Sequence, residues 1–112
     1  MILVFDSDLE KKVRKLIASW GNTDTKKMFG GICFLINGNM FSGIYKDFVF
    51  LRLGKEASQS ALNLPFVKPF DITGKPMKAW VMINKDGINT DENLKNWLNK
   101  ARAFANSLPP KN

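Results

Sequence analysis

Apolar residues between Met28 and Leu53 fall into three short runs, and the gaps between these runs contain the pairs Asn37-Gly38 and Lys46-Asp47. Asn-Gly is the strongest short signal for a hairpin, because both central residues of a type I′ turn need a positive φ, which Asn and Gly tolerate. The pattern therefore predicts three antiparallel strands joined as a meander.

Two-residue turns would fix the register of this meander, and the register decides on which face each side chain lies. One face is then mainly aliphatic and carries Cys33, Leu35, Met40, Ser42, Ile44, Val49, Leu51 and Leu53. The other is mainly aromatic and carries Ile32, Phe34, Ile36, Phe41, Tyr45, Phe48, Phe50 and Arg52. Since an antiparallel sheet normally keeps one face solvated, we expect each of these two apolar faces to need a cover.

Amphipathic helices are predicted at both ends of the chain. Ser7 and Glu10 have the spacing of a capping box, and the apolar stripe that follows ends near Gly21-Asn22. A second stripe begins after Thr90 and is stopped by Pro109-Pro110. Both helices are expected to cover the aliphatic face of the sheet.

The remaining segments complete an α+β prediction. We expect an extended segment over Asp24–Met28, a short helix over Lys55–Leu62, a long loop over 64–76 because of its three prolines and Gly74, and a strand over Met77–Ile83. The predicted fold is one domain over residues 1–112 with two layers, in which a mainly antiparallel sheet with a central three-stranded meander packs against N- and C-terminal helices.

Composition narrows the class of protein. The chain has 112 residues, 45% of them hydrophobic, and a net charge of +7 that is spread along its length. Such a charge is compatible with nucleic-acid binding, but it is more often simply the charge of a small soluble protein. A single cysteine excludes an internal disulfide, and the first residues lack the basic region and length of a secretory signal, so we expect a cytoplasmic protein.

Motifs for catalysis and cofactor binding are missing from the sequence. Histidine is absent, which removes the commonest general base and most zinc sites. Cys33 lies in an apolar strand, where a packing role is expected. Neither Gly30-Gly31 nor Gly54-Lys55 has the spacing of a phosphate-binding loop, and Asn84–Glu92 lacks the carboxylates of a calcium loop. We expect no enzyme activity, no metal and no cofactor.

The aromatic face leaves three interpretations open. The 64–76 segment could fold Phe66, Phe70 and Ile72 across it, a second copy or another protein could cover it, or its rings could stack nucleic-acid bases with Arg52 and nearby lysines on phosphates. For the second case, a homodimer should dissociate when Phe41 is replaced by Glu.

Several short motifs resemble the N-terminal domain of the TfoX/Sxy competence regulators. They are Met28-Phe29-Gly30-Gly31, the turn and strand start Asn37-Gly38-Asn39-Met40-Phe41, the strand Phe48–Leu53, Pro65-Phe66, Gly74 with Trp80, and Leu94-x-x-Trp97 followed by Ala101 and Ala105. The resemblance implies a non-enzymatic regulatory domain linked to transcription of competence genes, with the cAMP receptor protein as a partner. Full-length regulators of this family have a second, C-terminal domain, and we expect this chain of 112 residues to be a stand-alone copy of the first.

The resulting prediction is a cytoplasmic protein-interaction domain without a cofactor, with nucleic-acid binding as the alternative. Its partner is another protein or a second copy. The predicted interaction surface joins the aromatic face to the mouth formed by Met28–Gly31 and 64–76, and consists of Met28, Phe29, Gly30, Gly31, Phe34, Phe41, Tyr45, Phe48, Phe50 and Arg52.

Overall fold

The computed structural model describes residues 5–28, 30–71 and 74–110 of the chain. The helices in these ranges are α1 (Ser7–Ile17), α2 (Lys55–Ala61), the short 3-10 helix η1 (Lys85–Gly87) and α3 (Asp91–Asn106). The strands are β1 (Thr23–Met28), β2 (Gly31–Ile36), β3 (Asn39–Tyr45), β4 (Phe48–Arg52), β5 (Val67–Phe70) and β6 (Met77–Asn84).

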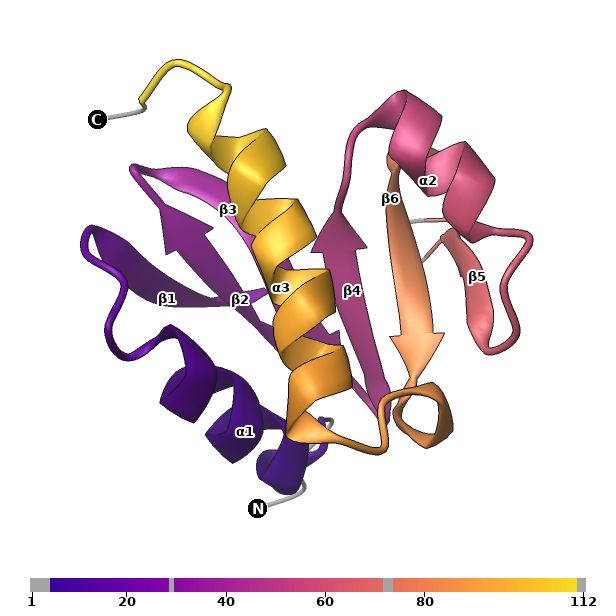
Figure 1. The fold of residues 1–112 in the computed structure, drawn as a ribbon, viewed down its shortest axis with the longest axis horizontal. Helices are drawn as coiled ribbons and strands as arrows, with labels where there is room; N and C mark the ends of the chain where they lie inside the picture. Colours follow the sequence, from indigo (N-terminus) through magenta and orange to yellow (C-terminus); the bar gives the residue numbers. More distant parts are fainter. Residues whose placement is uncertain (1–4, 29, 72–73, 111–112) are drawn as a thin grey trace.

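All six strands form one sheet in the order β1-β2-β3-β4-β6-β5, and every neighbouring pair is antiparallel. α1 and α3 lie on the same face of this sheet, and α2 lies near β6 (Figure 1). The buried Ala61 of α2 shares one core with residues of α1 and α3. The α+β prediction with a central antiparallel meander and terminal helices is therefore confirmed.

Side chains cap both terminal helices. Asp6, rather than Ser7, is the N-cap of α1, and its Oδ1 accepts hydrogen bonds from the N–H of Asp8 at 2.9 Å and of Leu9 at 3.1 Å. The predicted N-cap, Ser7 of the capping box, was thus wrong by one residue. The carboxylate at position 6 also caps well and complements the helix dipole. Thr90 caps α3 as the stripe predicts, with its Oγ1 accepting from the N–H of Asn93.

Both turns of the predicted meander are present. Asn37 and Gly38 have φ values of 51° and 80°, as a two-residue turn between β2 and β3 requires. Lys46 has a φ of 54° in the turn between β3 and β4.

A β-bulge at Phe41 overturns the predicted faces. Next to the turn the register is as expected, with Leu35 opposite Met40, but Phe34 then pairs with Ser42 and leaves Phe41 without a partner on β2. Because of this extra residue, the side chains of β2 share their faces with different residues of β3 and β4 than a regular register would give. Phe34, for example, lies on the same face as Ser42 and not on that of Tyr45. Neither face is therefore purely aliphatic or purely aromatic.

Both faces are nevertheless apolar, as predicted. The face under the helices buries sheet residues from both predicted sets, namely Ile32, Phe34, Ile36, Phe41, Ile44, Val49, Leu51 and Leu53. We call the opposite side the open face. It holds a second core of Cys33, Phe50, Phe70, Trp80 and Met82, with Met28, Met40, Tyr45, Phe48 and Ala79 partly buried around it.

Part of the predicted 64–76 loop is a strand. β5 pairs with β6 at the edge of the sheet, and Pro69 lies opposite Val81, next to a register shift between Pro69 and Phe70. Proline is tolerated on an edge strand and beside an irregularity, because its missing N–H removes no bond from the interior of the ladder. The prolines excluded a helix here, as predicted, but they did not exclude a strand.

Candidate interaction surfaces

The open face brings together only part of the predicted interaction surface. Tyr45, Phe48 and Phe50 contribute to its apolar cluster together with Met28, and Arg52 pairs with Trp80 on the same face. Gly30 is an exposed turn residue with a φ of 76°, Gly31 is a buried residue of β2, and Phe29 lies outside the described residues.

Phe34 and Phe41 were assigned to the wrong face. Both are fully buried, with 0% exposure, in the core beneath the helices. The bulge is the physical cause, since it places Phe41 and Ser42 on the same side of β3. Neither ring can reach a partner in this structure.

Aromatic rings pack closely at the centre of the open face. The ring centroid of Phe50 lies 4.9 Å from that of Phe70 and 5.7 Å from that of Trp80. Phe70 comes from the predicted 64–76 segment and is 2% exposed, so this segment supplies part of the intramolecular cover that was one of the interpretations. Phe66 supplies none, being 56% exposed, and Ile72 lies outside the described residues.

Cationic side chains border the rings of the open face. Lys68 Nζ lies 4.6 Å from the centre of the Phe48 ring. The guanidinium of Arg52 lies 5.7 Å from the centre of the Trp80 ring, and also 5.6 Å from that of Phe104, a residue of α3 that is not part of the open face. These rings already hold cations of the same chain against their faces, and Phe50 is 1% exposed. A stacked base would therefore have to displace side chains that are packed here.

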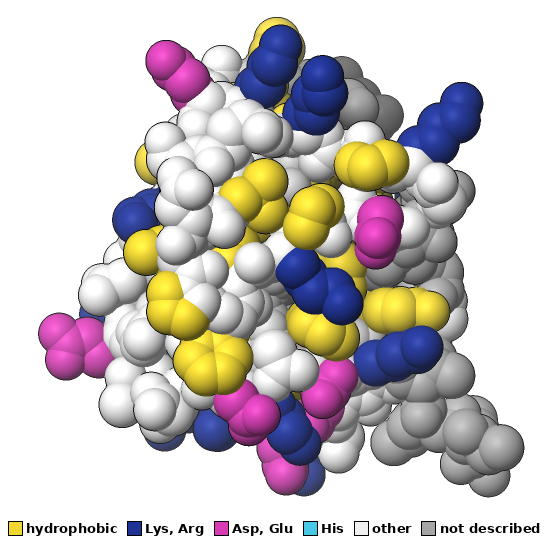
Figure 2. All heavy atoms as spheres, turned by 90° about the vertical axis from the view of Figure 1, so that its right-hand side faces the viewer, with side chains coloured by type: hydrophobic (Ala, Val, Ile, Leu, Met, Phe, Trp, Pro, Cys, Tyr) yellow, Lys and Arg dark blue, Asp and Glu magenta, His cyan; other side chains and the backbone are white. Residues whose placement is uncertain are grey.

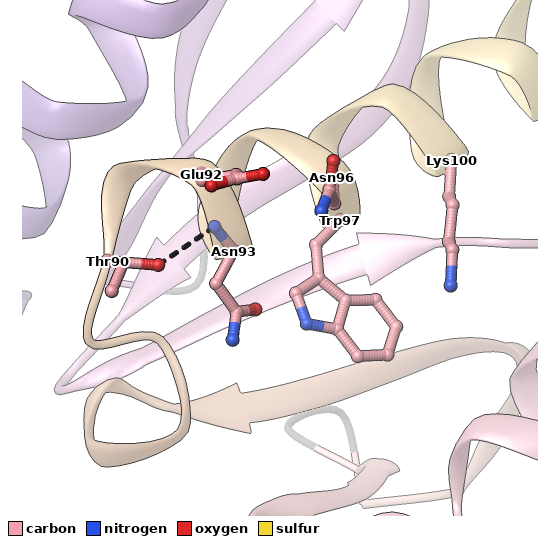
Figure 3. A pocket seen from close by; sticks show the side chains of 6 residues that line it. All are labelled: Thr90, Glu92, Asn93, Asn96, Trp97 and Lys100. Carbon is pink, nitrogen blue, oxygen red and sulfur yellow. Dashed lines mark hydrogen bonds between the residues drawn. The ribbon is translucent and has the colours of Figure 1, made fainter.

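A groove lies on the helix-covered side of the sheet. It lies between α2 and α3, has a volume of about 300 Å³, and is lined by Leu53, Ala57, Ser60, Ala61, Leu64, Trp97 and Lys100. We call it the α2–α3 groove. A second hollow of about 420 Å³ shares Trp97 and Lys100 with it and extends along α3 past Thr90, Glu92, Asn93 and Asn96. Figure 3 shows the indole of Trp97 projecting from α3 between the side chains of Asn93 and Lys100.

Large apolar side chains are exposed at the α2–β5 side of the molecule. Leu64, which lines the groove, is 48% exposed, and Phe66, two residues further on, is 56% exposed. Figure 2, viewed from the right-hand side of Figure 1, shows hydrophobic side chains at the surface with Lys and Arg side chains among them. The Nζ of Lys100 lies 4.8 Å from the centre of the Trp97 ring, so a cation and an aromatic ring meet in the groove. Exposed apolar patches with a polar rim are typical of protein-binding sites.

No pattern in the sequence predicts the groove. Trp97 belongs to the apolar stripe of the last helix, and a stripe residue is normally a core residue. The available signal was Leu64-Pro65-Phe66, where two large apolar residues flank a proline in a segment that was predicted as loop. In a single sequence this pattern does not distinguish apolar residues that pack inside a loop from apolar residues that are exposed and bind a partner.

Reactive and metal-binding groups are sparse in the described structure. Burial raises the pKa of the Cys33 thiol to about 11, which fits the packing role predicted for it. Across residues 5–28, 30–71 and 74–110, no three side chains of His, Cys, Asp or Glu are grouped so that they could hold a metal ion. The helices in these ranges are too short or too polar to cross a membrane.

Comparison with known proteins gives one family match. The model of the TfoX N-terminal domain matches residues 15–105, which include the C-terminal end of α1, the sheet, α2, and α3 up to Ala105. No curated protein matches the chain.

Proposed function

Because the chain belongs to the TfoX N-terminal domain family, we propose that it is a non-enzymatic, regulatory protein-interaction domain whose partner binds in the α2–α3 groove. The family resemblance makes the cAMP receptor protein the first partner to test, in the transcription of competence genes. The proposed compartment is the cytoplasm, in keeping with a single, buried cysteine.

The observation that carries the proposal is the exposure of Leu64 beside Trp97 in a concave apolar surface. Full burial of a leucine side chain is worth about 1.5–3 kcal/mol, so a partner gains from covering it. Tryptophan in a pocket is also among the residues that most often dominate the binding energy of an interface.

Charge indicates what kind of partner segment fits. Lys100 lies over Trp97 and has no ion pair among the described residues, and Lys55 is exposed at the start of α2. We therefore propose a partner segment with an apolar anchor for the floor of the groove and an acidic side chain for Lys100. Nucleic-acid binding remains the alternative, but Phe50, the central ring of the open face, has no exposed face for a base.

Calorimetric titration of the domain with the cAMP receptor protein tests this proposal. The variant Leu64→Glu places a charge in the apolar groove, and Met77→Glu is its matched control, because Met77 is a similarly exposed apolar residue (40%) that does not line the groove. We expect Leu64→Glu to weaken binding at least about tenfold, the equivalent of 1.4 kcal/mol, and Met77→Glu to leave it unchanged.

Two results would contradict the proposal in different ways. If titration of the unmodified domain shows neither release nor uptake of heat, the cAMP receptor protein is not its partner. If it binds and both variants bind as tightly, the α2–α3 groove is not the contact surface.

A further inference from the structure

The two edges of the sheet differ in their capacity to pair with another strand. β5, at one edge, has four residues and contains Pro69. β1, at the other edge, has six residues, Thr-Asp-Thr-Lys-Lys-Met, without proline or glycine, and its central four side chains are exposed. An edge strand of this kind presents free backbone groups to other chains unless something blocks it.

The hydrogen bonds identify which residues of β1 face outward. The N–H of Asn37 donates to the C=O of Asn22 at 3.0 Å, so Asn22 points its carbonyl toward the β2–β3 hairpin. In an antiparallel ladder the bonded residues alternate, so Asp24 and Lys26 direct their backbone groups to β2, whereas Thr23, Thr25 and Lys27 direct theirs away from the sheet. Thr25 bears this out, because its N–H donates to Oδ1 of Asp24, its own neighbour, at 2.8 Å.

We propose that β1 pairs antiparallel with β1 of a second copy of this chain, about a two-fold axis at Thr25. The axis stands perpendicular to the sheet, so that the helices of both copies stay on the same side and two six-stranded sheets join into one. The outward C=O of Thr25 accepts from the N–H of Thr25 in the second copy, and each of these N–H groups exchanges its hydrogen bond to Oδ1 of Asp24 for this one. Thr23 and Lys27 then bond to Lys27 and Thr23 of that copy.

Charge selects this register over its neighbours. With Thr25 opposite itself, Asp24 lies opposite Lys26 of the second copy, and symmetry makes this pair twice. A register centred on Lys27 would place two lysines opposite each other, and one centred on Thr23 would shorten the paired segment. Asp24 and Lys26 also occupy positions that are not hydrogen-bonded across the new interface, where opposing side chains come closest. Opposite charges directly across strands stabilise a pair, and like charges destabilise it.

The surroundings of β1 leave space for the second copy. A hollow of about 300 Å³ lies between α1 and β1 at this edge and is lined by residues of both, including Ile17 and Thr23. The aliphatic part of Lys27 from the second copy, opposite Thr23, would lie beside this hollow. The net charge of +7 on each copy opposes association, so it should be measured at moderate salt, which screens charge repulsion over long distances.

Charge exchange between two variants tests the register. Asp24→Lys places lysines at both positions 24 and 26, and Lys26→Asp places aspartates at both, so neither variant can pair with itself, but each complements the other. By sedimentation equilibrium we expect the unmodified chain to reach twice 12.7 kDa at high concentration. Each single variant should dissociate at least about tenfold more readily, and their equimolar mixture and the double variant Asp24→Lys/Lys26→Asp should recover the dimer.

Lys95→Asp, an exposed charge reversal on α3, is the control and should dimerise like the unmodified chain. Circular dichroism verifies that every variant folds, as expected for exposed positions. The inference is overturned if the unmodified chain stays monomeric at millimolar concentration, if the mixture of single variants gives no heterodimer, or if Lys95→Asp dissociates like Lys26→Asp. None of these results bears on the α2–α3 groove, which lies away from β1.

Discussion

The Nζ of Lys85 lies 3.4 Å from Oδ2 of Asp6, and the other oxygen of that carboxylate caps α1. One side chain thus holds the first turn of α1 and connects it to η1, which follows the last strand of the sheet. Burial raises the pKa of the Asp6 carboxyl, but hydrogen bonds from the Leu9 and Asp8 amides and the charge of Lys85 lower it more, so the pKa lies below its usual 3.8.

Replacing Asp6 by Ala should lower the free energy of unfolding by about 1 kcal/mol at pH 7, as is typical for loss of an N-cap. Since the pKa of Asp6 is depressed in the folded state, its contribution is complete above the unfolded value near 3.8 and is lost as the pH falls through the folded value. Urea denaturation of both proteins at pH 7 and pH 2 should show a smaller difference at pH 2.

Two controls sharpen this experiment on Asp6. Asp6→Asn keeps a capping oxygen without a charge and should retain most of the stability at pH 7. Asp8→Ala removes a nearby exposed carboxylate that does not cap the helix, and it should have a smaller effect. An equal loss at pH 2 and pH 7 for Asp6→Ala would contradict the role of the ionised carboxylate.

Cys33 should be unreactive in the folded protein. Only the thiolate reacts with disulfide reagents, and a pKa of about 11 leaves roughly one thiol in a thousand ionised at pH 8. We expect reaction with Ellman's reagent to be at least about a hundredfold slower in buffer than in denaturing urea. Equal rates in the two solvents would show that Cys33 is accessible in the native state.

Gly43 is required beneath the ring of Phe50. A Cβ atom at position 43 would collide with Cζ of Phe50 and would lie 2.5 Å from the carbonyl oxygen of Ile32. Gly43→Ala should therefore destabilise the fold by about 1–3 kcal/mol through overpacking.

The matched control for this substitution is Gly21→Ala, because a Cβ at position 21 meets nothing within 4 Å. Its stability in urea should differ from that of the unmodified chain by no more than about 0.5 kcal/mol. Similar stabilities of the Gly43 and Gly21 variants would contradict the close packing of Phe50 on β3.

Phe41 is a core residue, and its substitution should report on folding rather than on self-association. Its ring lies 5.6 Å from that of Trp20, centroid to centroid, and is fully buried. Phe41→Ala should cost about 3–5 kcal/mol, and Phe41→Glu, suggested by the sequence as a test for a dimer, should abolish cooperative unfolding because it buries an unpaired charge. Tyr45→Ala, at a half-buried position on the open face, should cost less in the same urea titration.

The sequence predicts elements best where the signal is local. Asn37-Gly38 gives the hairpin, because only a few residues accept positive φ at both positions, and the cap at Thr90 with its apolar stripe gives α3. The β-bulge at Phe41 is not indicated by any short sequence motif. It is favoured because it lets Phe41 and Ile44 both lie beneath the helices, and this depends on how the helices pack against the sheet.

The groove could not be predicted for a similar reason. Leu64 and Trp97 are more than thirty positions apart in the sequence, and only the packing of α2 beside α3 makes them neighbours. Neither residue has a distinctive local context, since each fits an ordinary core or loop position. The structure places Tyr45 and Phe48 together on the open face, as the strand period predicts, whereas Phe41 lies on the other face because the bulge interrupts that period.

The position of β6 between β4 and β5 also constrains the order of assembly. β5 precedes β6 in the chain but pairs with no other strand among the described residues, so it can join the sheet only together with β6 or after it. We expect the early nucleus to contain the β2–β3–β4 meander, whose pairings are local. The chain from β5 onward would then add in a later step, and the α2–α3 groove would be among the last surfaces to form.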